Sequence, residues 1–192
     1  MPFSVELFRD MIGLQPEGSA REELENACER YGTLRTPLQK ARCIRSMMTV
    51  FDTSFDEPVR RTIMEACGCR CLGNSVVAKA LLLQCKARDL DELLVMLNDA
   101  HIGGGNLHRK ECAIYATYSR CHCGSVSKTK ECFSPTYCHC SCGWFRRLFE
   151  ALLQRPVDVE LLGSIIQGEK ACRFVIRLDR KSTRLNSSHG KL

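Results

Sequence analysis

The sequence has no apolar run long enough to cross a membrane as a helix, and its start does not resemble a leader peptide. No stretch approaches eighteen uninterrupted apolar residues. The first residues, MPFSVELFRDMIG, lack a basic segment followed by a long apolar one. The sequence therefore predicts a cytoplasmic protein with no membrane partner.

The sequence also has only a small net charge. Residues 179–189, DRKSTRLNSSH, can be encoded residue for residue by a common sequencing-library adapter read in frame, so we treat residues 179–192 as a foreign tail. That tail holds four basic residues and one acidic residue, and without it the formal net charge of +6 falls to about +3. Such a balance attracts phosphates weakly, so we expect no nucleic-acid partner.

The sequence lacks a phosphate-binding loop in the right context. Gly103, Gly104 and Gly105 form a sharp break between His101 and Asn106. A phosphate-cradling loop needs a strand before it and a helix after it, and here the order is reversed. The glycines instead predict a hinge or a pocket wall, since they allow positive φ and close backbone approach.

Cysteine, in contrast, is abundant. The chain has fourteen cysteines, six of them within residues 120–144, where Cys-His-Cys occurs twice. In a reducing compartment such a content indicates metal or thiol chemistry rather than a disulfide framework. The alternative is that each cysteine is packed as a small apolar residue.

Two Cys-x-Cys pairs fourteen residues apart predict a metal site made by Cys121, Cys123, Cys138 and Cys140. In extended segments both sulfurs of a pair share one face, and the intervening His122 and His139 point away. Four soft thiolates suit structural zinc, with an iron-sulfur cluster as the alternative. The set requires the following helix to start near Ser141, because a helix from Pro135 would align Cys138 with Cys142 instead.

Hydrophobic periodicity predicts an α+β fold, in which N-terminal helices precede an antiparallel sheet with one long helix. Residues 1–56 are expected to be a helical preface and residues 57–178 the cysteine-rich α+β domain. Ser19 and Asp89 are predicted to cap helices, and Pro37 is predicted to be the first residue of another. Alternation predicts strands over 112–118, 157–161 and 172–178, with Gly168 at the turn between the last two. Cys67 and Cys71 would share one helix face.

Several motifs of the second half carry a resemblance to known families. Cys-x-Cys-Ser-x-Gly-Trp at 138–144, the run 157–168 and Cys-Arg-Phe at 172–174 resemble the end of vinyl-reductase-like domains. More closely, residues 60–178 resemble an uncharacterised family of cysteine-rich proteins from anaerobic bacteria. Some relatives of that family are labelled L-2-amino-thiazoline-4-carboxylate hydrolase-like. The resemblance implies a small-molecule-binding α+β fold and cysteine roles that extend to Cys172.

The function expected from the sequence is a small-molecule-binding module with a four-cysteine metal site. The alternative is an enzyme, either a metal-dependent hydrolase of C–N or C=N bonds or an iron-sulfur redox protein. The expected partners are a small ligand and, as an option, a second copy of the chain. The candidate pocket residues are His101, Gly103, Gly104, Gly105, Asn106, Trp144 and Glu160, and the candidate additional thiols are Cys67, Cys71, Cys142 and Cys172.

Overall fold

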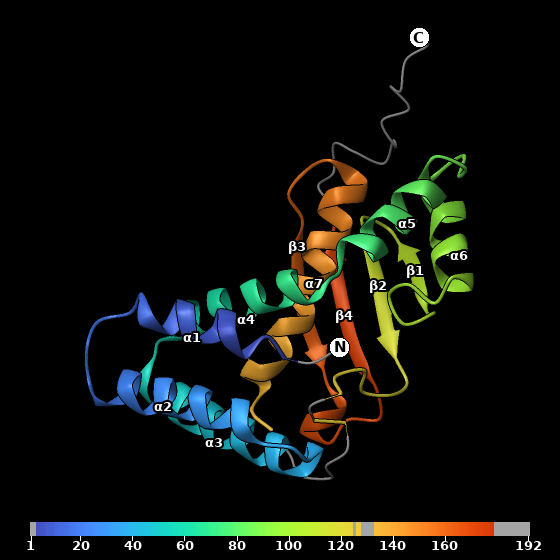
Figure 1. Ribbon diagram of the computed structural model, residues 1–192. Helices are drawn as coiled ribbons and strands as arrows, with labels where there is room; N and C mark the ends of the chain where they lie inside the picture. The colour runs from blue at the N-terminus through green and yellow to red at the C-terminus, as the bar shows by residue number, and fades with distance from the viewer. Residues whose placement is uncertain (1–2, 125, 128–132, 179–192) are drawn as a thin grey trace.

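The computed structural model describes residues 3–124, 126–127 and 133–178 (Figure 1). This part of the chain contains seven α-helices and one four-stranded antiparallel sheet, so the predicted α+β class is confirmed. The predicted tail, residues 179–192, lies outside the described residues. The elements are α1 (Val5–Gly13), α2 (Ser19–Thr33), α3 (Pro37–Ser54), α4 (Glu57–Cys71), α5 (Asn74–Gln84), α6 (Leu90–Asp99), β1 (Leu107–Lys110), β2 (Ala113–Tyr118), α7 (Pro135–Leu153), β3 (Asp158–Gly163), the 3-10 turn η1 (Ile165–Gln167) and β4 (Cys172–Arg177).

Local signals set the starts of several helices. Pro37 is the first residue of α3, as predicted. The carboxylate of Asp89 accepts a hydrogen bond at 2.9 Å from the backbone nitrogen of Glu92, which caps α6 as predicted. Ser19 is the first residue of α2 rather than its cap, so that prediction was wrong by one position.

The sheet has the strand order β1-β2-β4-β3, and every neighbouring pair is antiparallel. Ile114 of β2 lies opposite Ile176 of β4, which places both on the buried face. Cys112 is exposed and lies just before β2, so the strand begins one residue later than predicted. The short strand β1 was not predicted from the sequence. A tight turn at Glu111, with φ of 54°, separates it from β2.

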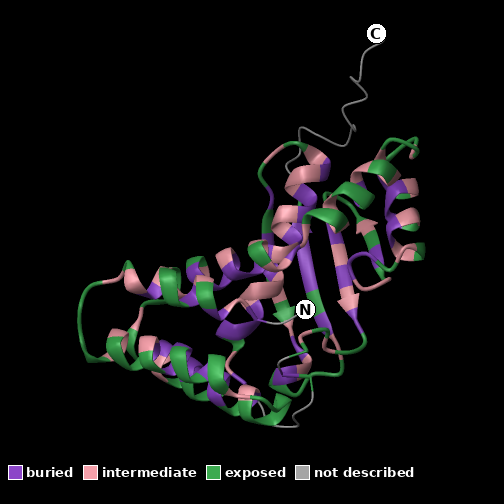
Figure 2. Cartoon of the chain, viewed as in Figure 1, coloured by how far each residue is buried: buried purple, intermediate pink, exposed green. Residues whose placement is uncertain are grey.

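Two apolar clusters form the interior (Figure 2). The first cluster contains side chains of helices α1, α2, α3 and α4 and of the beginning of α7. In it, the ring centroids of Phe3 and Tyr137 lie 5.6 Å apart. The second lies between α7 and the sheet, where Phe145 packs on Phe174 with ring centroids 5.1 Å apart. The first cluster therefore combines residues of the predicted 1–56 preface with residues of the 57–178 segment.

Helices α4 and α7 cross in backbone contact, and two glycines make this possible. A Cβ added at Gly68 would lie 1.7 Å from the carbonyl oxygen of Cys140. A Cβ added at Gly143 would lie 1.9 Å from the carbonyl oxygen of Glu65. Since neither position can hold a side chain, the crossing fixes the C-terminal half of α4 against α7.

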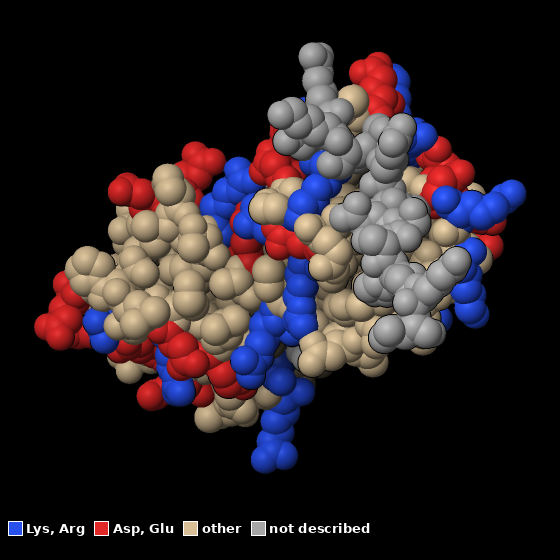
Figure 3. Space-filling view, turned by 90° about the horizontal axis from the view of Figure 1, so that it is seen from above, with Lys and Arg blue, Asp and Glu red and all other residues tan. Residues whose placement is uncertain are grey.

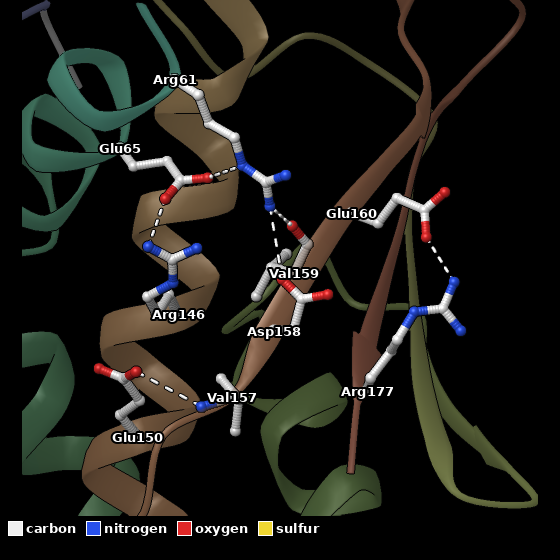
Figure 4. Close-up of polar contacts among 9 residues, drawn as sticks. All are labelled: Arg61, Glu65, Arg146, Glu150, Val157, Asp158, Val159, Glu160 and Arg177. Carbon is white, nitrogen blue, oxygen red and sulfur yellow. Dashed lines mark hydrogen bonds and ion pairs between the residues drawn. The ribbon is translucent and has the colours of Figure 1, made fainter. Parts of the chain in front are cut away.

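A buried carboxylate ties this crossing to the sheet (Figure 4). Glu65 forms ion pairs with Arg61, at 2.7 Å, and with Arg146 of α7. Arg61 also donates a hydrogen bond at 3.0 Å to the carbonyl oxygen of Val159 in β3. The side chain of Glu65 is only 6% exposed, so its charge is compensated by the two guanidinium groups rather than by water.

No single helix within the described ranges has the length and apolar composition needed to cross a membrane. Helices α4 and α5 reach those criteria only when taken together, and they meet at an angle of 74°. On the surface, Figure 3 shows a band of Lys and Arg side chains across one face, with Asp and Glu side chains on either side of it.

Candidate functional site

A pocket of about 240 Å³ lies where the end of α4, the middle of α7, the glycine loop and the end of β2 meet. Rings, thiols and two imidazoles form most of its wall. The lining residues are Phe3, Cys71, His101, Gly103, Gly104, Tyr118, His122, Cys123, Cys140, Ser141 and Trp144.

The aromatic wall of the pocket is built around Tyr118, the last residue of β2. Its ring stacks on Phe145 at 5.5 Å with an interplanar angle of 22°, and the ring of His122 meets it edge-on at 5.0 Å. Burial raises the pKa of Tyr118 well above its ordinary value. Burial also lowers the pKa of His122, so its imidazole is neutral at neutral pH.

The glycine loop closes the pocket over this ring. Gly104 has φ of 90°, and a Cβ there would lie 2.0 Å from a ring carbon of Tyr118. The side chain of Asn98 holds the far end of the loop, because it both donates to the backbone oxygen of Leu107, at 2.8 Å, and accepts from its nitrogen, at 2.7 Å. The loop backbone is therefore a fixed wall of the pocket.

The thiols of Cys71 and Cys140 share a hydrogen bond inside the pocket. That bond lowers the pKa of Cys71 to about 7 and raises the pKa of Cys140 well above its ordinary value. When Cys71 is ionised, its thiolate accepts this hydrogen bond from the thiol of Cys140. In contrast, burial raises the pKa of Cys28 and of Cys67 to about 12.

Arg147 fixes the end of α4, where Cys71 is the last residue. Its guanidinium donates hydrogen bonds to the carbonyl oxygens of Cys69, at 2.6 Å, and Leu72, at 2.7 Å. These carbonyls would otherwise lack partners at the helix C-terminus. The same side chain extends from α7, so it locks the position of Cys71 relative to Cys140.

A third thiol lies beside the pair. Sγ of Cys123 is 2.8 Å from the hydroxyl oxygen of Tyr137. Burial raises the pKa of Tyr137 well above its ordinary value, so the phenol stays protonated. The contact anchors the segment after β2 on α7.

Of the four predicted metal ligands, Cys138 is buried in the first apolar cluster, and Cys121, Cys123 and Cys140 are partly buried against it. Helix α7 begins at Pro135, not near Ser141, so Cys138 and Cys140 lie on different sides of it. Cys138 is hydrogen-bonded to Ser164, and Cys140 to Cys71. Across the ranges that the structure describes, no group of three or more His, Cys, Asp or Glu side chains is arranged to hold a metal ion.

Some of the predicted pocket residues line the pocket and others do not. His101, Gly103, Gly104 and Trp144 line the pocket, whereas Gly105 and Asn106 belong to the loop without lining it. Glu160 lies on β3 in an ion pair with Arg177 at 2.5 Å and is not a lining residue (Figure 4).

Of the additional thiols, only Cys71 lines the pocket. Cys67 and Cys142 are buried in the first and second clusters, and Cys172 accepts a hydrogen bond at 3.4 Å from the nitrogen of Ile165. Sequence reasoning missed Tyr118 and Ser141 as lining residues. The alternation in β2 predicts that Tyr118 is on the buried face of the strand. Only the tertiary structure shows that a pocket lies next to it.

The fold and the site together define an α+β domain with a thiol-lined pocket at the crossing of two helices. The chain belongs to a family of unknown function, DUF6144, whose model matches residues 22–183. None of the curated proteins matches it. Among solved structures, the chain is similar to the phenol-responsive sensory domain of the transcription activator PoxR with phenol. That likeness has 16% sequence identity and a TM-score of 0.42, and it covers 76% of this chain and 75% of the other.

Proposed function

We propose that the chain is a small-molecule-binding domain whose ligand occupies the pocket between α4, α7 and the glycine loop. The observation that carries the proposal is the lining itself, in which apolar rings surround a few polar groups. Such a combination is typical of ligand sites, because the rings provide buried contact area and the polar groups fix orientation.

The chemistry of the wall favours a small molecule with a flat apolar part. Tyr118 and Trp144 both line the pocket, so their rings can contact such a part of the ligand. The neutral imidazole of His122 can donate one hydrogen bond and accept another, which suits a single polar substituent. The volume of about 240 Å³ limits the ligand to one or two rings.

Larger hollows elsewhere are less suited to this role. The hollow of about 480 Å³ between α2 and α3 is lined by Glu22, Glu23 and Arg30 among others, and these side chains are exposed. Charged groups that water already solvates gain little from a small ligand. The pocket at Tyr118 instead has walls from four elements that are far apart in the sequence.

The zinc site, its iron-sulfur alternative and the enzyme alternatives stay predictions from the sequence. The described residues supply no set of three ligands for a metal, so we derive no step of the function through one. A homodimer is likewise an expectation that the binding proposal does not require.

The fluorescence of Trp144 tests the proposal, because it is the single tryptophan of the chain and it lines the pocket. Titration with single-ring and fused two-ring aromatic compounds should change the emission in a saturable way. Ser141→Leu, which fills the pocket, should weaken binding at least tenfold, whereas Ser75→Leu on the exposed start of α5 should not. Equal binding by both variants would contradict the proposal.

A further inference from the structure

Helices α2 and α3 form an outer layer of the molecule and carry opposite net charges. The two helices lie side by side, below α1 and α4 in Figure 1, and Figure 2 shows much of their outward side exposed. Helix α2 has four acidic and two basic residues, so its formal net charge is −2. Helix α3 has three basic residues and one acidic residue, so its formal net charge is +2.

Two neighbouring hollows show how these charges are arranged on the surface. The groove of about 480 Å³ between the helices is lined on its α2 side by Glu22 and Glu23, and it reaches Ser46 of α3. A second hollow, of about 410 Å³, also reaches Ser46, and its lining includes Arg42 and Arg45. The surface therefore passes from an acidic ridge on α2 (Glu22 and Glu23), across the groove, to a basic ridge on α3 (Arg42 and Arg45).

All four ridge side chains are exposed to solvent. Arg42 and Arg45 also make contacts within the chain, and each remains exposed enough to face a second molecule. Leu38, which is 44% exposed, lies one turn before Arg42 on the same face of α3. A surface that mixes exposed charges with a few apolar side chains is typical of interfaces that form reversibly rather than permanently.

We propose that this layer is the contact surface of a reversible homodimer, in which the acidic ridge of each copy faces the basic ridge of the other. A two-fold axis along the groove produces this arrangement, because the rotation turns one layer over onto the other and exchanges its two sides. The contact between opposite ridges then occurs twice in each dimer, and it sets the register of the two copies.

The order of the charges is the reason to expect a second copy as the partner. A different protein would have to carry both ridges in the matching order, whereas a second copy of this chain supplies them by symmetry. This inference goes beyond the binding of a small ligand and does not depend on it.

The association should be weak and sensitive to salt, because attraction between exposed charges is small and is screened by ions. Sedimentation equilibrium of the full chain measures it, with dithiothreitol present so that the exposed Cys85 and Cys112 cannot crosslink two copies. We expect dimers at about 100 µM protein in about 0.05 M salt, and at least tenfold weaker association in about 0.5 M salt.

Reversal of the ridge charges tests whether this surface makes the dimer. Glu22→Arg/Glu23→Arg makes both ridges basic, and Arg42→Glu/Arg45→Glu makes both ridges acidic. Each variant alone should be monomeric at low salt, because both contacts of its homodimer would repel. An equimolar mixture of the two variants should form a heterodimer, because in it each ridge again faces its opposite.

The matched control is Lys79→Glu/Lys86→Glu, which reverses two exposed charges in and just after α5. This variant should dimerise as the unaltered protein does. Heterodimer formation in the mixture would also show that both reversed variants are folded. If Arg42→Glu/Arg45→Glu does not fold, Arg42→Gln/Arg45→Gln replaces it and should still weaken the dimer.

Three outcomes would overturn the proposal. The first is an unaltered protein that stays monomeric at low salt, which would leave the layer to a different partner. The second is a pair of reversed or neutralised variants that dimerise as well as the control. The third is a mixture that stays monomeric although both variants melt at the temperature of the unaltered protein.

Discussion

The backbone of Gly143 lies directly against the backbone of Glu65, so that a Cβ at Gly143 would sit 1.9 Å from the Glu65 carbonyl oxygen. This contact joins α7 to α4 at the point where both the buried ion network and the pocket begin. It sets the spacing that brings Cys71 to Cys140.

Gly143→Ala should lower the free energy of unfolding by about 3 kcal/mol, because the added methyl group must push two helix backbones apart. Gly32→Ala is the matched control, since Gly32 is also helical but a Cβ there would meet nothing within 4 Å. The control should be neutral or stabilising by about 0.5–1 kcal/mol, through helix propensity. Urea denaturation measures both, and equal effects would contradict the close contact.

Glu65→Gln should destabilise the protein by about 3 kcal/mol, because it removes the charge that compensates Arg61 and Arg146 in a buried setting. Glu169→Gln removes an exposed partner of Arg173 and should cost less than about 1 kcal/mol. A loss of similar size in the two variants would show that Glu65 is not the stronger anchor.

Alkylation of Cys71 by iodoacetamide should depend on pH with a midpoint near pH 7. The pKa of Cys71 is lowered to about 7 by the hydrogen bond from Cys140, so its reactive thiolate is present above that pH and is lost as the pH falls below it. Cys140→Ala removes the donor and should move the midpoint upward, toward the ordinary thiol value. Peptide-resolved mass spectrometry gives the rates, and an unchanged midpoint in the variant would be the contrary result.

The buried thiols of Cys28 and Cys67 should make the protein less stable at alkaline pH. Burial raises the pKa of Cys28 and Cys67 to about 12, so the protonated thiols stabilise the fold fully below the unfolded-state pKa of about 8.5. This contribution is lost as the pH rises from about 8.5 toward 12. Cys28→Ala should therefore show a smaller decrease in stability between pH 8 and pH 11 than the unaltered protein does, measured by urea denaturation.

Elemental analysis of anaerobically purified protein tests the zinc prediction. If the set of four cysteines binds zinc, Cys138→Ser should lower the metal content while Cys132→Ser should leave it unchanged. Equal metal content in the two variants contradicts the set. A brown, oxygen-sensitive sample would instead support the iron-sulfur alternative.

The fold class followed from sequence because local patterns determine it. In α3, Ile44, Met48 and Phe51 recur at three- and four-residue steps, which is the pattern of a buried helix face, and all three are buried. The alternation in β2 and β4 predicted the strands. The metal set required α7 to start near Ser141, and that requirement is not met, because the helix begins at Pro135.

The site could be predicted only in part. The glycine loop indicated a pocket wall, because its composition alone limits its conformations. The contact between Cys71 and Cys140 joins positions 69 residues apart in sequence and depends on Gly68 and Gly143, whose role is visible only once the helices are packed. The helical repeat puts Cys71 on one face with Cys67 and Cys69 on another, but it does not show what either face packs against.

Helix α7 contributes Tyr137 near its beginning to the first apolar cluster and Phe149 near its end to the second. Neither cluster can open without exposing part of the same helix, so the two should unfold as one cooperative unit. Amide protons in the middle of α7 should then exchange with solvent only through global unfolding. A ligand held between the two clusters would slow exchange in both, including in the N-terminal helices that it does not touch.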